Sequence, residues 1–142
     1  MNDLPLQKTN HPSEADEHWL EASINQFNIQ QTGYDDYEPL VLFIHQADGT
    51  RIAGLAAFSW GGTLRILSLW VQENWRRQGY GTQLLVAAER EACARGCKQA
   101  VVETHSFQAP QWYPEQGYTM CGVADDYPLG HQHLTFQKRL MP

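Results

Sequence analysis

The chain has 142 residues, and its ten lysine and arginine residues are outnumbered by sixteen aspartate and glutamate residues, which gives a formal net charge of −6. A chain of this length can bury a core of its own, so residues 1–142 are expected to form a single domain. The acidic balance argues against a protein that binds nucleic acid through a basic face. No apolar run approaches the roughly 18 residues that a membrane-spanning helix needs, so we expect no membrane partner either.

The three cysteines are an odd number and do not form a disulfide framework. Residues 1–11 lack the charged and then apolar pattern of a secretory signal. Together these features predict a cytoplasmic protein with reduced thiols. Cys93 and Cys97 are four residues apart and the histidines lie elsewhere, which is not the repeated spacing of a zinc site, so we expect no metal.

The first part of the chain predicts one long helix. Residues 1–10 could form a strand or an irregular lead, because Leu4 and Leu6 alternate only weakly. Ser13 is a candidate N-cap, with Asp16 three residues later in a box-like position. An apolar stripe at helical spacing then continues to about residue 30, and Gly33 is expected to end the helix.

Three apolar segments follow a polar and aromatic loop at residues 34–39, and they predict an antiparallel meander. The segments cover residues 40–45, 52–60 and 63–71. Asp48-Gly49 and Gly61-Gly62 are the dipeptides expected in the two turns between them.

The second half predicts a crossover and a closing hairpin. A helix over residues 82–95, with Glu91 and Arg95 at i,i+4 and Gly96 as its C-cap, leads to a strand at 99–104 that should lie parallel to the strand at 63–71. A short helix from Pro110 to Gly117 and strands at 118–123 and 131–140 complete the chain. The fold class is therefore α/β, with a mixed, mainly antiparallel central sheet flanked by helices.

The stretch between residues 71 and 82 carries the chemistry. A strand leads through a glycine-bearing turn into a helix whose first backbone N–H groups have no partner within the helix. These groups and the helix dipole favour an anion, and Gly79 and Gly81 would let a phosphate approach the main chain. Arg76 and Arg77 add positive charge. Leu84 stands where the dinucleotide fingerprint needs its third glycine, and no Gly-Lys-Ser/Thr sequence is present.

The remaining pattern, Arg76-x-x-Gly79-x-Gly81, resembles the pyrophosphate loop of the GNAT superfamily of N-acetyltransferases. A second segment, Ala109-x-x-Trp112-Tyr113-x-x-x-Gly117-Tyr118, is similar to the helix and turn of the same superfamily. The resemblance covers roughly residues 40–140 and implies the GNAT acyltransferase fold, with acetyl-CoA as co-substrate and no metal. It implies that the following residues contact the co-substrate: Leu69, Val71, Arg76, Arg77, Gln78, Gly79, Tyr80, Gly81, Thr82 and Ser106. Ser106 departs from the asparagine that many relatives carry there.

The resemblance also assigns the catalytic roles. Tyr113 stands at the position of the family's general acid, which protonates the leaving thiolate. From periodicity alone, Tyr113 would be a core aromatic residue beside Trp112. Glu103, at the end of the strand at 99–104, is the candidate general base, although a solvated carboxylate is an equally good interpretation.

The predicted function is transfer of an acetyl group from acetyl-CoA to a primary amine of a small molecule or peptide, by direct attack and without an acyl-enzyme. A homodimer is compatible with this function. Two alternatives stay open. One is a nucleotide- or phosphosugar-binding transferase, for which no base-recognition motif is found. The other is a catalytically degenerate domain that serves as an acyl-CoA sensor or as an interaction module. The sequence leaves the acceptor, the acyl-chain preference and the oligomeric state undefined.

Overall fold

The computed structural model describes residues 3–141 as two units, one ending at Asp35 and the other beginning at Asp36. The first unit contains the helix α1, Glu14–Thr32. Its capping box is the one that the sequence predicts: the Ser13 hydroxyl accepts from the Asp16 N–H, and the Asp16 carboxylate accepts from the Ser13 N–H. Gly33 ends the helix with a φ of 77°, a conformation that glycine adopts without strain. Residues 3–10 form neither helix nor strand, so of the two predictions for this segment the irregular lead is correct.

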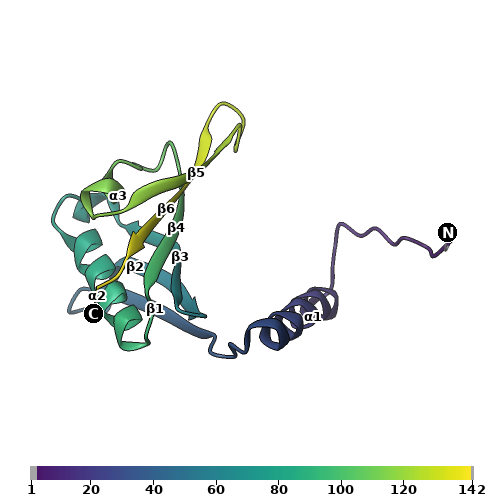
Figure 1. The fold of residues 1–142 in the computed structure, drawn as a ribbon. Coiled ribbons are helices and arrows are strands. Elements are labelled where there is room, and N and C mark those ends of the chain that lie inside the picture. The colour runs from purple at the N-terminus through teal and green to yellow at the C-terminus, as the bar shows by residue number, and fades with distance from the viewer. Residues whose placement is uncertain (1–2, 142) are drawn as a thin grey trace. The chain divides into compact units, whose positions relative to one another are not determined.

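The second unit is built on a six-stranded sheet with the order β1-β2-β3-β4-β6-β5 (Figure 1). The strands are β1 (Glu38–His45), β2 (Arg51–Trp60), β3 (Thr63–Val71), β4 (Gln99–His105), β5 (Thr119–Asp125) and β6 (Gln132–Arg139). Neighbouring strands are antiparallel except β3 and β4, which are parallel. The predicted meander, crossover and closing hairpin are all confirmed.

The element bounds differ from the predictions by a few residues. β1 begins at Glu38, inside the stretch predicted as loop, and Pro39 is tolerated there because β1 is an edge strand. The helix α2, Tyr80–Ala94, begins two residues earlier than expected. The short helix α3 is limited to Trp112–Glu115, and a 3-10 turn, Glu73–Trp75, lies between β3 and α2.

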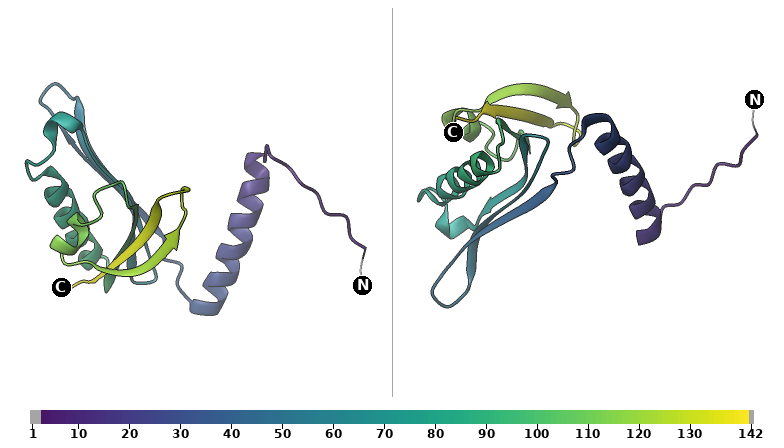
Figure 2. Two further views of the ribbon diagram at one scale, coloured as in Figure 1. Left: turned by 90° about the horizontal axis from the view of Figure 1, so that it is seen from above. Right: turned by 60° about the horizontal axis from the view of Figure 1, so that its bottom comes forward.

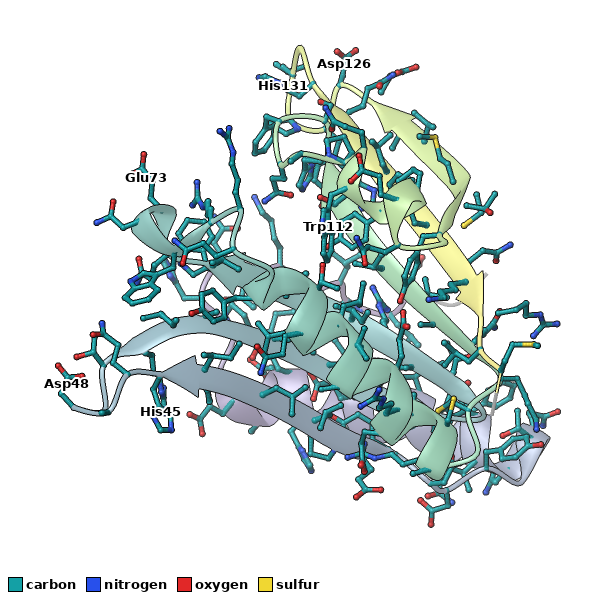
Figure 3. The ribbon with its side chains drawn as sticks, turned by 90° about the vertical axis from the view of Figure 1, so that its left-hand side faces the viewer. His45, Asp48, Glu73, Trp112, Asp126 and His131 are labelled. Carbon is teal, nitrogen blue, oxygen red and sulfur yellow. The ribbon has the colours of Figure 1, made fainter. Side chains whose placement is uncertain are left out.

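The helix α2 lies across one face of the sheet and covers β1, β2 and β3 (Figures 2 and 3). Alternate residues of each strand point into this core. The largest fully buried side chains are Phe136, Leu55, Leu64, Ile66 and Leu85. The end of α2 is fixed by Arg95, whose guanidinium bonds Glu91 at 3.0 Å, as predicted, and also donates to the carbonyls of Glu38 and Pro39.

Candidate active site

The two parallel strands at the centre of the sheet part before they end. β3 and β4 pair only from Thr63 with Gln99 to Ile66 with Val102, although β3 continues to Val71. A bulge accompanies the change, because Ala56 and Ala57 of β2 face Ser68 and Ile66 and leave Leu67 without a partner. An extra residue bends a strand and increases its twist. Beyond Ile66 and Val102 the two strands are not hydrogen-bonded to each other, and we call the region between their carboxyl ends the β3–β4 opening.

Leu69 and Val71 line this opening with their main chain. Bonded and non-bonded positions alternate along an antiparallel pair of strands. The Gln72 N–H donates to the Ile52 carbonyl at 2.8 Å, so Val71 and Leu69 occupy the non-bonded positions of β3. Their backbone N–H groups consequently point away from β2 and toward the opening.

The segment that follows β3 leads to the N-terminus of α2. Arg77 has a φ of 62° and Gly79 has a φ of 90°, so the main chain has a left-handed conformation at two of the three residues 77–79. The first helical hydrogen bond runs from the Gln83 N–H to the Gly79 carbonyl at 3.0 Å. The N–H groups of Tyr80, Gly81 and Thr82 precede this bond and have no partner within the helix. They form the open end of α2 at which the sequence predicts anion binding.

Three side chains of the segment already have partners within it. Arg76 donates from Nε to the Val71 carbonyl at 2.9 Å, and its guanidinium lies 4.7 Å from the centre of the Trp70 ring. Gln78 donates to the Asn74 carbonyl at 3.2 Å, and Tyr80 contacts Trp75 edge-on. These contacts give the segment a defined shape and leave the exposed Arg77 as its more available cation.

Gly81 lies beneath the aromatic side chain of Trp112. A Cβ added at Gly81 would lie 3.5 Å from that ring and 3.8 Å from Val71, which is ordinary van der Waals contact. Packing within the protein therefore does not by itself require a glycine at position 81. Figure 3 shows Trp112 between the start of α2 and the strands that carry the closing hairpin.

Tyr113 is buried, with 7% of its surface exposed, on the face of the sheet that α2 covers. Its ring stacks on Phe136 at 5.6 Å and meets Tyr118 edge-on at 5.9 Å. Its hydroxyl has no hydrogen-bond partner among residues 3–141. Every fully buried side-chain oxygen of these residues has a partner, so the unpaired Tyr113 oxygen reaches the surface. Burial raises the pKa of Tyr113, which keeps the phenol protonated. A packed ring with a free, protonated hydroxyl is suited to donate a proton.

A partly buried polar network lies next to Tyr113. The Tyr118 hydroxyl donates to Glu89 at 2.7 Å, and Glu89 also accepts from the Lys138 ammonium at 2.9 Å. The network joins three parts of the fold: α2 through Glu89, the turn before β5 through Tyr118, and β6 through Lys138. Together these parts hold the Tyr113 ring. Sequence reasoning did not identify it, because Glu89 and Lys138 are 49 positions apart.

Glu103 and Ser106 lie at the end of β4. Glu103 is the first β4 residue beyond the pairing with β3, and its side chain is on the face opposite α2. Its carboxylate contacts Arg65 at 3.2 Å and His133 at 3.4 Å. The Ser106 hydroxyl accepts from the Gln132 N–H at 2.9 Å, which ties the end of β4 to the start of β6. The sequence analysis does not single out His133, because only the β4–β6 register places it beside Glu103.

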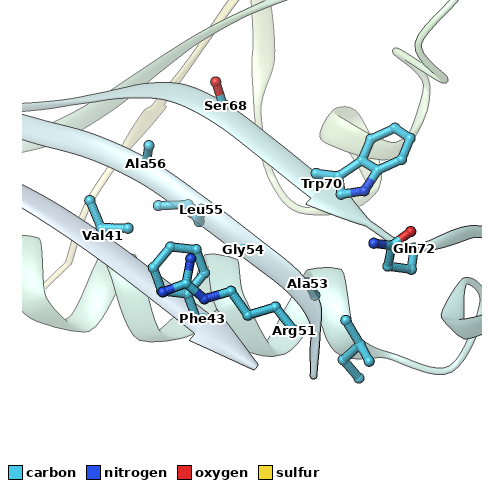
Figure 4. A pocket seen from close by; sticks show the side chains of 11 residues that line it. Val41, Phe43, Arg51, Ala53, Gly54, Leu55, Ala56, Ser68, Trp70 and Gln72 are labelled. Atoms are coloured by element: carbon cyan, nitrogen blue, oxygen red, sulfur yellow. The ribbon is translucent and has the colours of Figure 1, made fainter. Parts of the chain in front are cut away.

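A separate hollow of about 320 Å³ lies on the face of the meander opposite α2 (Figure 4). Apolar side chains such as Val41, Phe43 and Trp70 line most of it, and the Arg51 guanidinium covers the Phe43 ring at 3.8 Å. No histidine, cysteine or carboxylate lines it among the described residues, and its Ser68 hydroxyl has no such partner in the hollow, so the candidate chemistry is assigned to the β3–β4 opening. Residues 3–141 also contain no cluster of three metal-ligating side chains, and none of their helices is long and apolar enough to cross a membrane.

The fold and the opening between β3 and β4 place the chain in the class of α/β acyltransferases that use acyl-CoA. Residues 5–118 match the Acetyltransferase (GNAT) family, and the chain belongs to this family. It is an acetyl-CoA-dependent acetyltransferase.

Individual relatives agree with this assignment. An acetyltransferase of Agrobacterium fabrum is 31% identical over 113 residues, which are 80% of this chain and 82% of that protein. A blasticidin-S acetyltransferase of Streptomyces morookaense is 32% identical over 109 residues, covering 72% of this chain and 78% of that protein. A crystal structure of an acetyltransferase from Agrobacterium tumefaciens superposes with a TM-score of 0.90 at 26% identity, covering 96% of this chain and all of that one.

Proposed function

We propose that the protein transfers the acetyl group of acetyl-CoA to a primary amine of a small molecule or peptide, by direct attack of the amine on the thioester. The observation that supports this most strongly is the early end of β3–β4 pairing at Ile66 and Val102. It leaves backbone donors of β3 unpaired at the centre of a sheet, where an extended ligand with amide groups would satisfy them.

The residues around the opening fit an acyl-CoA. The N–H groups of Leu69 and Val71 would hold the amides of the pantetheine arm. The backbone N–H groups of residues 79–82, with Arg77 and Gln78 beside them, would hold the pyrophosphate. Arg76 would act mainly by shaping this loop, since its Nε is bound to the Val71 carbonyl. Ser106 retains its own hydroxyl proton and could donate it to the arm, because it is an acceptor toward Gln132.

Glycine at position 81 is explained by this ligand. An added Cβ would be tolerated by Trp112 and Val71, so contacts within the protein do not account for the glycine. A phosphate that approaches the backbone N–H groups would need that space.

The chemistry needs one proton donor and one proton acceptor. Tyr113 would give its hydroxyl proton to the thiolate as the carbon–sulfur bond breaks. Its raised pKa keeps the proton available across the neutral range. A group on the opposite face of the sheet, where Glu103 and its neighbour His133 lie, would accept the proton of the amine.

The acceptor is proposed from the relative whose name carries one. The similarity to a blasticidin-S acetyltransferase makes blasticidin S the first candidate, followed by other amine-bearing small molecules and by peptide amino groups. A screen of these amines with acetyl-CoA, in which release of free thiol is followed, tests the proposal. We expect thiol release above the rate of hydrolysis with at least one amine. Tight CoA binding without thiol release from any amine would instead support an acyl-CoA sensor.

A further inference from the structure

Five aromatic rings surround the end of β4 and the β5–β6 hairpin, and the acetyl transfer described so far does not use them. They belong to His105, Phe107, Tyr127, His131 and His133. The rings of His133 and Tyr127 stack at 4.9 Å, and His105 meets His133 edge-on at 5.1 Å. His105 is itself fixed, because its Nδ1 is 3.0 Å from the Tyr127 carbonyl oxygen and donates to it. The His133 ring is therefore held on two sides.

Glu103 is poorly placed to accept a proton from a substrate. Its Oε1 contacts the Arg65 guanidinium at 3.2 Å, and its Oε2 contacts the His133 Nε2 at 3.4 Å. Both carboxylate oxygens therefore already have partners from neighbouring strands.

His133 has the properties that Glu103 lacks. The Glu103 carboxylate, 3.4 Å from Nε2, electrostatically favours a proton on that nitrogen, and the neutral ring then has a lone pair on Nδ1. Nδ1 has no hydrogen-bond partner among residues 3–141, and 19% of the side chain is exposed. His133 is diagonal to Glu103 across the β4–β6 register, on the face opposite Tyr113.

We infer that the Nδ1 of His133 is the group that takes the proton from the acceptor amine, and that Glu103 is the residue that positions it. This inference rests on the proposed acetyl transfer. His133 removes one proton from the ammonium group, and the freed lone pair forms the carbon–nitrogen bond. The carbon–sulfur bond then breaks and Tyr113 protonates the sulfur. The new amide nitrogen releases its second proton, which returns to the Tyr113 oxygen through solvent, and His133 releases its own proton to solvent.

The arrangement predicts an acid limb in the pH–rate profile, because protonation of Nδ1 removes the lone pair. The groups that face His133 are Glu103 from β4, Arg65 from β3 across that carboxylate, His105 from β4 and Tyr127 from the hairpin. Glu103→Gln removes the carboxylate that favours the proton on Nε2, so the rate should fall.

The deciding variant is His133→Gln, which keeps an N–H donor near the position of Nε2 and removes the base. With an alkylamine or with blasticidin S as acceptor, we expect kcat to fall about 100-fold, the range for general-base catalysis. With hydroxylamine, which is already neutral near pH 7, we expect little change. The matched control is His131→Gln, two residues away, whose exposed ring contacts only Phe107 among the described residues. It should be as active as the wild type.

Two results would overturn the inference. One is wild-type kcat of His133→Gln with the ammonium acceptors, and the other is an equal loss with hydroxylamine, which would indicate a structural role. Nitrogen-15 NMR of the wild-type protein reads the tautomer without any acceptor, and a neutral His133 with its proton on Nδ1 would also overturn it. Failure of the proposed function is distinct, since the wild type would then bind no CoA or release no thiol.

Discussion

At the scale of single residues, the hydroxyl of Tyr113 can be separated from its ring. The ring packs against Phe136 and Tyr118, whereas the hydroxyl has no partner within residues 3–141. Tyr113→Phe should therefore leave the melting temperature and the affinity for CoA nearly unchanged. It should lower kcat by about 100-fold or more, the range for loss of a general acid. The measurement is turnover at saturating acetyl-CoA, beside a melting curve and CoA calorimetry on the same variant.

A fully active Tyr113→Phe enzyme would refute the role of Tyr113 as the proton donor. A variant that loses both activity and CoA binding would indicate that the hydroxyl serves the fold or the co-substrate instead. The two outcomes are distinguished by the calorimetry.

We expect the Tyr118 hydroxyl to make the free energy of unfolding depend on pH, rather than the rate of acetyl transfer. Burial and the hydrogen bond to Glu89 raise its pKa above the ordinary value of 10.0. The folded protein holds this proton more tightly than the unfolded chain, so the stabilisation is complete below about pH 10 and is lost as the pH rises through the folded-state pKa. Tyr118→Phe should lower the free energy of unfolding by about 1 kcal/mol near neutral pH. It should also make the decline above pH 10 shallower.

Urea unfolding of wild type and Tyr118→Phe, near neutral pH and at alkaline pH, measures this difference. Tyr37→Phe is the control, because Tyr37 is 63% exposed and its hydroxyl is not in the network. Parallel alkaline declines for wild type and Tyr118→Phe would contradict the assignment.

At the scale of elements, two substitutions at the N-terminus of α2 separate the effect of charge on CoA binding from the effect of bulk. Gly81→Asp places a carboxylate where the pyrophosphate would lie, so CoA binding should be abolished by like-charge repulsion. Gly81→Ala adds a Cβ at 3.5 Å from Trp112 and no charge, so the fold should persist with a smaller loss of CoA affinity. Calorimetry with CoA compares the two variants. Wild-type affinity in Gly81→Asp would exclude this helix end as the phosphate site.

The elements themselves were largely predictable, for reasons visible in particular residues. Ser13 and Gly33 define α1 because an N-cap hydroxyl and a glycine at positive φ are strong local signals. β3 matches its prediction to the residue, since the Gly61-Gly62 turn fixes one end. The bulge at Leu67 was not predictable, because it depends on how β3 pairs with β2 rather than on residues nearby in sequence.

At the scale of the whole molecule, the sequence predicted the α/β sheet and the order of its elements along the chain, but not that β6 lies beside β4, and the candidate site only in part. The loop from Arg76 to Thr82 and Tyr113 are candidates because their two patterns resemble those of the GNAT superfamily. The pair formed by Glu103 and His133 depends on the β4–β6 register, which joins residues 30 positions apart in the chain. The sequence alone does not show which of His105 and His133 contacts Glu103, because both are strand histidines and only the fold gives their partners.

The whole fold also makes a thermodynamic prediction about the donor. A ligand that binds only the native state raises the melting temperature. CoA and acetyl-CoA should do so, whereas NADH and ATP at the same concentration should do so less, because they lack the pantetheine arm that fits the β3–β4 opening. Equal shifts with all four compounds would argue for a general phosphate site.

The most direct test of the central claim is a crystal structure of the protein with acetyl-CoA. We predict that the pantetheine arm lies between β3 and β4 beyond Ile66 and bonds the main chain of Leu69 and Val71. The thioester sulfur should then lie within hydrogen-bond reach of the Tyr113 hydroxyl, at about 3.5 Å or less, slightly beyond the usual range because the acceptor is sulfur. An acetyl-CoA bound elsewhere, for example over the hollow beside Trp70, with the β3–β4 opening empty, would contradict the account.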